Sequence, residues 1–405
     1  MTGTADFDFD EAVDRSNTNA IKWDEARGAL PMWVADMEFR AAPAIREALQ
    51  RRLDNGVFGY SGIPRAWNDA YAHWWRERHG LTIDPDALVF ATGVIPAISS
   101  MVRKLTTPAE NVLVMTPVYN IFFNSILNNG RNALASPLVR DGRGGYAIDW
   151  EDLESKLADP QTTLMILCNP HNPTGMVWDQ ETLARIGELC AAHRVTVISD
   201  EIHCDLTDPG VDYVPFAAAS ETCRRISATC MAPTKAFNIA GLHTAAVMAD
   251  DPFLRHRIWR GLNTDEVAEP NAFAVDAAIA AFTQGGPWLD ALRDYVAANK
   301  REAERIIDDY NVSAAPERRV TLCQGAATYL MWLDCSALLA SGETTDALCE
   351  QLVRDQRVMV SPGSQYRGDG GDCLRINVAC PRATMREGLR RMVAGLAAYP
   401  SAPRG

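Results

Sequence analysis

The chain has 405 residues, which favours two domains, or one large α/β domain with a smaller one appended, and leaves room for a buried cofactor. Its 39 basic and 52 acidic residues give a net charge of −13, which argues against a nucleic-acid partner, because such proteins present basic faces to phosphate. The ten cysteines lie between Cys168 and Cys380 without a C-x-x-C pair. We therefore expect reduced thiols and neither a metal site nor a disulfide framework.

The N-terminal stretch MTGTADFDFDEAVDR is acidic, where a secretory signal would be basic and then apolar. No uninterrupted apolar run reaches the length needed to span a membrane. We therefore expect a cytoplasmic protein with no membrane association.

Short apolar runs alternate with helix-like segments, such as 179–194, through the first two thirds of the chain. Short strands that are apolar throughout and separated by helices are typical of a largely parallel sheet covered on both faces. The predicted strands are 87–90, 111–117, 163–168, 195–200, 224–231 and 244–249.

The pattern changes at about residue 290, where a long charged helix is predicted over 288–310. The runs at 326–334, 358–363 and 373–379 follow it and are typical of a smaller α+β unit. The predicted division is an N-terminal segment 1–50 that contributes to the small domain, a large domain 51–287 and a small C-terminal domain 288–405.

The residues directly after each predicted strand are the candidate site residues, because ligands of open parallel sheets bind outside the carboxyl ends of the strands. After the first strand, ATGVIPAISS turns into a helix whose Val94 and Ile95 amides could hold a phosphate, although a plain strand-to-helix turn is the alternative. Tyr119 follows the second strand and could stack on a planar ring or belong to the core.

The third strand runs into CNPHNPTG, in which prolines restrain Asn169 and Asn172 to non-helical conformations and so direct their amides. Taken alone, this segment is an ordinary tight turn. The fourth strand ends in the acid pair Asp200 and Glu201, which would suit the metal-binding acid of a nucleotide hydrolase. That reading requires a G-x-x-x-x-G-K-[ST] loop, which the chain lacks.

Lys235 follows the fifth strand between apolar neighbours, a setting that lowers the pKa of an amine and makes it a usable nucleophile. A solvated surface charge is the alternative. Pyridoxal phosphate accounts for all five strand ends together. It needs a lysine for the Schiff base, an anionic carboxylate for the ring nitrogen, a phosphate cradle, a donor to the phenolate and a stacking aromatic ring.

The segments NPHNPTG, SDEIHCDL and APTKAFNIAGL resemble the signature segments of the fold-type I pyridoxal-phosphate enzymes, the aspartate aminotransferase superfamily. PMWVADMEF, FGYSGIP and LRINVACPR further resemble the cystathionine β-lyase branch, which includes the MalY and PatB types of C–S lyase. The likeness covers essentially the whole chain. It implies an α/β fold with a mostly parallel seven-stranded sheet flanked by helices, a smaller α+β domain and a homodimer.

The resemblance also implies roles for the residues at the strand ends. Lys235 would carry the Schiff base and act as the general base, Asp200 would pair with the ring nitrogen, and Asn172 would donate to the phenolic oxygen. Tyr119 would stack on the ring, and the Val94 and Ile95 amides would hold the phosphate.

Two further residues would complete the site by resemblance. Tyr60 would reach the phosphate from the neighbouring subunit, and Arg375 would bind the substrate carboxylate as a bidentate fork. In LRINV, Leu374, Ile376 and Val378 share one face, so Arg375 and Asn377 point together to the other. A surface arginine is the alternative for Arg375.

The chain departs from the superfamily pattern near the lysine. The usual hydroxyl three residues before it is Ala232, the usual arginine eight residues after it is His243, and Thr234 is the available substitute in the phosphate cup. His203 stands where ordinary transaminases tend to have tyrosine, and it could serve the ring, the phenolate side or neither.

The resemblance implies a lyase that cleaves cystathionine or a related cysteine S-conjugate to a thiol, pyruvate and ammonia. A transaminase on the same scaffold is the first alternative. A cofactor-binding regulator that acts by protein contact is the second, and no surface feature of the sequence identifies its partner.

Overall fold

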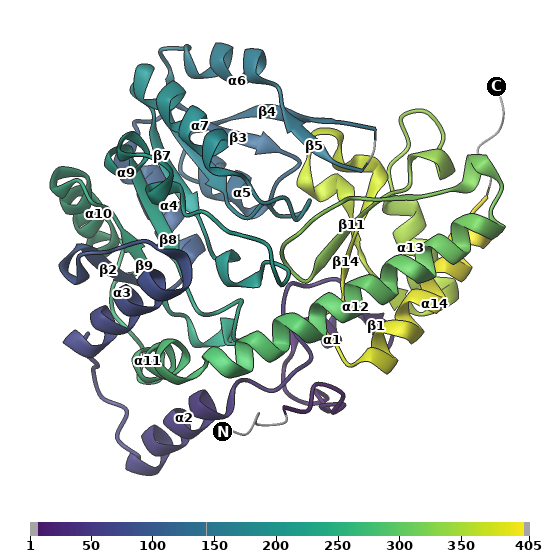
Figure 1. Ribbon diagram of the computed structural model, residues 1–405, viewed down its shortest axis with the longest axis horizontal. Helices are drawn as coiled ribbons and strands as arrows, with labels where there is room; N and C mark the ends of the chain where they lie inside the picture. The colour runs from purple at the N-terminus through teal and green to yellow at the C-terminus, as the bar shows by residue number, and fades with distance from the viewer. Residues whose placement is uncertain (1–6, 143, 401–405) are drawn as a thin grey trace.

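A computed structural model describes residues 7–142 and 144–400 of the chain. Its largest element is an eight-stranded sheet with the strand order β2-β9-β8-β7-β6-β3-β4-β5 (Figure 1). The strands are β2 (Leu88–Ala91), β3 (Asn111–Thr116), β4 (Asn132–Arg140), β5 (Tyr146–Ile148), β6 (Thr162–Cys168), β7 (Thr196–Asp200), β8 (Ser227–Met231) and β9 (Ala245–Met248).

The central strands β4, β3, β6, β7 and β8 are parallel, so the largely parallel sheet predicted from the apolar runs is confirmed. β9 is antiparallel to both of its neighbours, and β5 is antiparallel to β4. The sheet has one strand more than the seven expected from the resemblance, because the short β5 folds back on β4 as a hairpin. The sequence analysis did not predict β4 or β5, whose mixed burial pattern lacks the continuous apolar run of the inner strands.

Helices cover both faces of this sheet, and alternate strand residues face opposite sides. Val112 and Val114 of β3 pack in the apolar cluster under α4, α5 and α10, whereas Leu113 and Met115 pack in the cluster under α6 to α9. The helices are α2 (Pro43–Asn55), α3 (Arg65–His79), α4 (Val94–Leu105), α5 (Ile121–Leu127), α6 (Trp150–Leu157), α7 (Gln180–Ala192), α8 (Phe216–Ala219), α9 (Glu221–Ile226), α10 (Pro252–Thr264) and α11 (Ala274–Gln284).

Several helix ends follow directly from local sequence. The carboxylates of Asp179 and Asp251 accept hydrogen bonds from the Thr182 and Leu254 amides at 2.7 Å, so both aspartates cap their helices. Gly56 ends α2 at a φ of 72°, a left-handed conformation that favours glycine.

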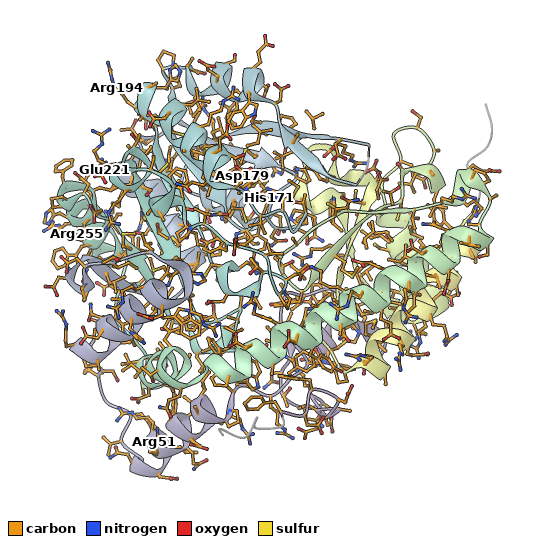
Figure 2. The ribbon with its side chains drawn as sticks, in the orientation of Figure 1. Arg51, His171, Asp179, Arg194, Glu221 and Arg255 are labelled. Carbon is orange, nitrogen blue, oxygen red and sulfur yellow. The ribbon has the colours of Figure 1, made fainter. Side chains whose placement is uncertain are left out.

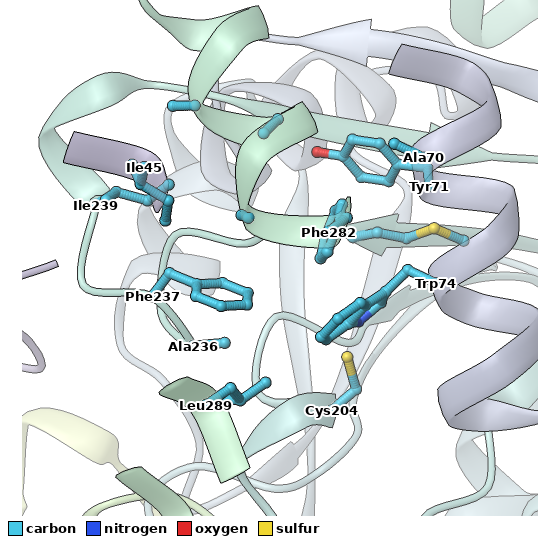
Figure 3. Packing of buried hydrophobic residues seen from close by; sticks show 14 of the residues in the cluster. Ile45, Ala70, Tyr71, Trp74, Cys204, Ala236, Phe237, Ile239, Phe282 and Leu289 are labelled. Atoms are coloured by element: carbon cyan, nitrogen blue, oxygen red, sulfur yellow. The ribbon is translucent and has the colours of Figure 1, made fainter. Parts of the chain in front are cut away.

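An aromatic cluster anchors the segment that carries Lys235. The ring of Phe237 lies 5.9 Å from that of Trp74 and 6.3 Å from that of Phe282, and Tyr71 meets Phe282 edge-on at 4.6 Å (Figure 3). Phe237 is fully buried. Because tightly packed aromatic rings resist displacement, the lysine two residues before Phe237 lies on a fixed support.

The smaller unit consists of an antiparallel sheet, β10-β11-β14-β13, covered by three helices. The long helix α12 crosses from the large sheet to this unit (Figure 1), and it extends the predicted helix 288–310 slightly at both ends. The elements are α12 (Gly286–Ser313), β10 (Thr321–Leu322), β11 (Leu330–Asp334), α13 (Asp346–Gln356), β12 (Val358–Met359), β13 (Ser361–Pro362), β14 (Cys373–Asn377) and α14 (Arg382–Ala398).

The N-terminal segment contacts both units. After α1 (Ile21–Asp24), the strand β1 (Leu30–Pro31) pairs in parallel with β12 of the smaller unit, whereas α2 packs against α11 beside the large sheet. The domain boundaries at 50/51 and 287/288 stay a prediction. Among the described residues, no helix combines the length and the apolar character needed to cross a membrane.

Candidate active site

Eight of the ten predicted site residues line one cavity of about 230 Å³ at the carboxyl ends of the strands. They are Val94, Ile95, Tyr119, Asn172, Asp200, His203, Thr234 and Lys235. The cavity is also lined by residues without a predicted role, namely Ala35, Thr92, Gly93, Pro96, Cys168, Ile202, Ala240, His243 and Thr244. His243, which departs from the superfamily pattern, therefore lies at the cavity, whereas Ala232 is not among its lining residues.

The turn after β6 is held in place by a hydrogen bond within it and by close packing against neighbouring backbone. His171, labelled in Figure 2, belongs to this turn and is fully buried. Its Nδ1 lies 2.9 Å from the hydroxyl of Thr174, and burial lowers the pKa of the imidazole to about 4. Gly175 has a φ of 71°, and a Cβ there would lie 2.9 Å from the carbonyl oxygen of Ala327. The close approach explains the glycine, and the fixed turn in turn fixes Asn172.

Asn172 contacts Arg375 directly. Nη1 of the arginine donates to Oδ1 of the asparagine at 3.1 Å, which leaves Nδ2 of the same amide to donate to a ligand. Arg375 also donates from Nη2 to the carbonyl oxygen of Trp33 at 3.0 Å, whereas its Nε is buried without a hydrogen-bond partner among the described residues. Leu374, Ile376 and Val378 pack in the core of the smaller unit, so the predicted separation of faces along β14 is confirmed.

Asp200 ends the buried strand β7 and is itself 4 % exposed. Burial raises the pKa of its carboxyl to about 7, while the Ile202 amide, which donates to Oδ1 at 3.2 Å, acts in the opposite direction. A cation bound beside this carboxylate would favour its charged form.

Lys235 lies in the turn after β8, where its Nζ donates to the carbonyl oxygen of Ala35 at 2.6 Å. Burial, and then the charge of Arg375, lower the pKa of the amine to about 8. The amine therefore has an accessible neutral form near physiological pH, which is the form that acts as a nucleophile or base.

His203 is buried, and its Nδ1 has no hydrogen-bond partner in the described part of the chain. Burial lowers the pKa of this imidazole to about 3, so it is neutral and can accept or donate one hydrogen bond to a ligand. Burial likewise raises the pKa of Tyr119 to about 12, so the phenol is un-ionised.

The helix α4 begins at the cavity without a side-chain cap. The amides of its first turn, which include Val94 and Ile95, lack intrahelical acceptors, and the helix dipole makes this end favourable for an anion. The hydroxyl-bearing Thr234 lines the same cavity.

Tyr60 lies outside the cavity of its own chain. The residue belongs to the segment between α2 and α3 and is fully exposed. Its role toward a neighbouring subunit stays a prediction. The sequence analysis missed the carbonyl groups of Trp33 and Ala35, because main-chain acceptors leave no residue-type signal. The only available indication was the resemblance of PMWVADMEF to a family segment.

Residues 34–392 match the family described as aminotransferase class I and II. The chain belongs to this family. It is 43 % identical to cystathionine β-lyase PatB of Bacillus subtilis, with 96 % of this chain and 99 % of the relative covered. It is 35 % identical to the protein MalY of Escherichia coli, with 96 % and 98 % covered.

A solved structure of cystalysin from Treponema denticola, described as containing a pyridoxal 5′-phosphate cofactor, superposes with a TM-score of 0.89 at 30 % identity. The superposition covers 97 % of this chain and 100 % of the cystalysin chain. The family resemblance and the fold class expected from the sequence motifs are confirmed.

Proposed function

We propose that this protein is a pyridoxal-phosphate-dependent C–S β-lyase that cleaves cystathionine or a related cysteine S-conjugate to a thiol, pyruvate and ammonia. The observation that carries the reaction type is the 43 % identity to a cystathionine β-lyase over 96 % of the chain. The chemistry of the site is independent support, because the amine of Lys235, the carboxylate of Asp200 and the uncapped N-terminus of α4 line one cavity.

The donor set of the cavity fits the cofactor. The α4 amides and Thr234 suit its phosphate, and Asp200 suits a protonated ring nitrogen. Nδ1 of His203, which has no hydrogen-bond partner among the residues that the structure describes, suits a polar group on the ring. Lys235 would hold the cofactor covalently through its amine, and Tyr119 would stack on the ring. When bound, pyridoxal phosphate draws electron density away from the substrate's α-carbon.

Each residue then has one task. With the cofactor bound, the negative charge of Asp200 would keep a proton on the ring nitrogen, and Asn172 would donate from Nδ2 to the phenolic oxygen. Arg375 binds the substrate carboxylate as a fork, which orients the α-carbon hydrogen toward Lys235. Once the incoming substrate has released the amine of Lys235, that amine, whose pKa is lowered to about 8, would in its neutral form remove this hydrogen as a proton. Loss of the thiolate from the β-carbon would then complete the elimination, and hydrolysis of the remaining enamine by water would give pyruvate and ammonia.

The test is incubation of the purified protein with cystathionine in the absence of any keto acid. Elimination restores the enzyme in each cycle, so homocysteine, pyruvate and ammonia are expected in equal amounts over many turnovers. A transaminase would stop after one turnover until a keto acid is supplied. Product formation that depends on added keto acid, without pyruvate from the substrate's own carbon, would replace the lyase by the aminotransferase.

The active form is proposed to be a homodimer in the cytoplasm, with Tyr60 donated to the phosphate of the partner's site. The support is an exposed apolar surface near Tyr60, where Val57 and Phe58 are 67 % and 52 % exposed. The ring of Phe58 lies 5.6 Å from that of Phe273, which lines a surface groove together with Leu242, and His243 beside Leu242 lines the cavity.

A further inference from the structure

One short segment, Trp33 to Glu38, binds both cationic side chains of the site. The Ala35 carbonyl accepts from Lys235 Nζ at 2.6 Å and from the hydroxyl of Tyr329 at 3.0 Å, and the Trp33 carbonyl accepts from Arg375 at 3.0 Å. The segment forms neither a helix nor a strand. The position of its carbonyl groups therefore depends on side chains that bind it from elsewhere.

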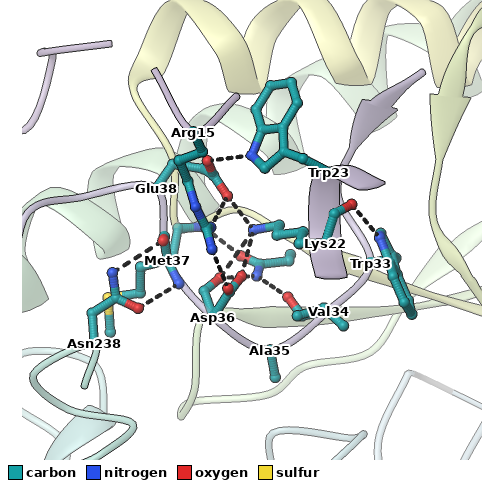
Figure 4. Close-up of polar contacts among 12 residues, drawn as sticks. Arg15, Lys22, Trp23, Trp33, Val34, Ala35, Asp36, Met37, Glu38 and Asn238 are labelled. Carbon is teal, nitrogen blue, oxygen red and sulfur yellow. Dashed lines mark hydrogen bonds and ion pairs between the residues drawn. The ribbon is translucent and has the colours of Figure 1, made fainter. Parts of the chain in front are cut away.

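A cluster of ion pairs holds the segment, with Lys22 and Glu38 buried and Arg15 and Asp36 half-buried (Figure 4). Lys22, whose side chain is 1 % exposed, lies with Nζ 2.9 Å from Glu38 Oε1 and 3.3 Å from Asp36 Oδ1, and it donates to the Asp36 carbonyl at 3.0 Å. Arg15 pairs with the same two carboxylates at 2.9 and 3.0 Å. The two cations balance the two carboxylates in charge, which offsets the cost of burying Lys22 and Glu38.

Two asparagines hold the segment at its sides. Asn377 donates from Nδ2 to the carbonyls of Val34 and Asp36 at 2.6 and 2.7 Å. Asn238, three residues after Lys235, accepts from the Met37 amide at 2.9 Å and donates to the Met37 carbonyl at 3.0 Å. Each carbonyl from Trp33 to Met37 thus accepts a hydrogen bond from a side chain, so the segment has little freedom to move.

We propose that Lys22 is a positioning residue for the reaction: through Asp36 and Glu38 it fixes the Trp33 and Ala35 carbonyls, and these carbonyls direct Arg375 and Lys235. The main-chain carbonyl of Lys22 also accepts a hydrogen bond from Trp33 Nε1 at 2.9 Å, which holds the Trp33 side chain. The inference rests on the proposed roles of Lys235 and Arg375. It adds Lys22, a residue that does not line the cavity and whose side chain donates to Asp36 instead of contacting Lys235 or Arg375.

The test uses Lys22→Met, which keeps a long unbranched side chain and removes its charge. In the cofactor-free protein, amide hydrogen exchange over residues 33–38 is expected to rise about tenfold. The rate at which an acylating reagent modifies Lys235 at its high-pH plateau, where the amine is neutral, is expected to rise about threefold because the Ala35 carbonyl no longer retains it. In the cofactor-loaded protein, kcat should fall and KM should rise, and Lys22→Arg should recover most of both.

Lys300→Met is the matched control. Lys300 is a second buried lysine, 2.7 Å from Asp208 Oδ2 and 3.1 Å from the Gly325 carbonyl, and it does not line the cavity. It should lower stability without changing exchange over 33–38 or the plateau rate at Lys235. If Lys22→Met does not fold, Asp36→Asn at a partly exposed position is measured in its place.

The proposal would be overturned if Lys22→Met shows faster amide hydrogen exchange over residues 33–38 but acylates Lys235 at the same plateau rate as the parent protein. The segment would then be loosened without any effect on the lysine. An equal response in Lys300→Met would overturn it as well, because the effect would then be general destabilisation. Both measurements use the cofactor-free protein. They remain readable if cystathionine is not the substrate, so failure of the positioning role and failure of the lyase function are distinguishable.

Discussion

Lys235 is expected to titrate well below an ordinary lysine. Burial and the nearby Arg375 guanidinium both disfavour its ammonium form, which lowers the pKa of the amine from 10.5 to about 8. Acylation needs the neutral amine, so the labelling rate of Lys235 in the cofactor-free protein should rise with pH, reach half its maximum near pH 8 and level off above it. Mass spectrometry of the Lys235 peptide after labelling at a series of pH values measures this midpoint.

Arg375→Met provides the control for the charge effect. Removing the cation removes a repulsion, so the midpoint for Lys235 should move upward in this variant. A parent midpoint near that of exposed lysines would contradict the expectation. Such a result would mean that water screens the amine more than its half-buried position implies.

The first turn of α4 should bind the cofactor's phosphate through main-chain amides. An aspartate at position 95 would place a negative charge beside this anion and cancel the favourable helix dipole, whereas an asparagine has the same size without the charge. Ile95→Asp is therefore expected to weaken cofactor binding by about tenfold or more relative to Ile95→Asn. Titration of the cofactor-free proteins with pyridoxal phosphate measures the two dissociation constants. Equal constants would show that the phosphate lies away from this helix end.

Six of the eight strands of the large sheet, and the residues after them, were predictable, because these buried strands leave continuous apolar runs in the sequence, which β4 and β5 lack. Asp200 and Lys235 could be found as polar residues that close such runs. The segment from Trp33 to Glu38 could not be found this way. It has no periodic pattern, it acts through main-chain carbonyls, and two of its partners, Asn377 and Arg375, lie more than 300 residues away in the chain.

The site is completed only when the two units of the molecule are held together. Arg375 belongs to β14 of the smaller sheet, yet its Nη1 contacts Asn172 after β6 of the large sheet. Arg140 at the end of β4 ties the same units by ion pairs with Asp334 at 2.7 Å, Asp369 at 2.9 Å and Asp372. A composite site of this kind ties substrate binding to the relative placement of the two units, which explains why charged links as well as apolar packing join them.

The proposed homodimer extends this composite character to two chains. Tyr60 is fully exposed next to the apolar Val57 and Phe58, so a second copy could cover this segment while Tyr60 reaches the partner's cavity. Lys235→Ala and Tyr60→Ala proteins should each be inactive alone. Mixing equal amounts under conditions of subunit exchange should restore about a quarter of the parent activity, because about half of the dimers are mixed and each of these has one intact site. Size-exclusion chromatography and native mass spectrometry confirm the exchange. Mixed dimers without recovered activity would exclude a shared site, since each would then contain an intact Lys235 and an intact Tyr60 that do not meet.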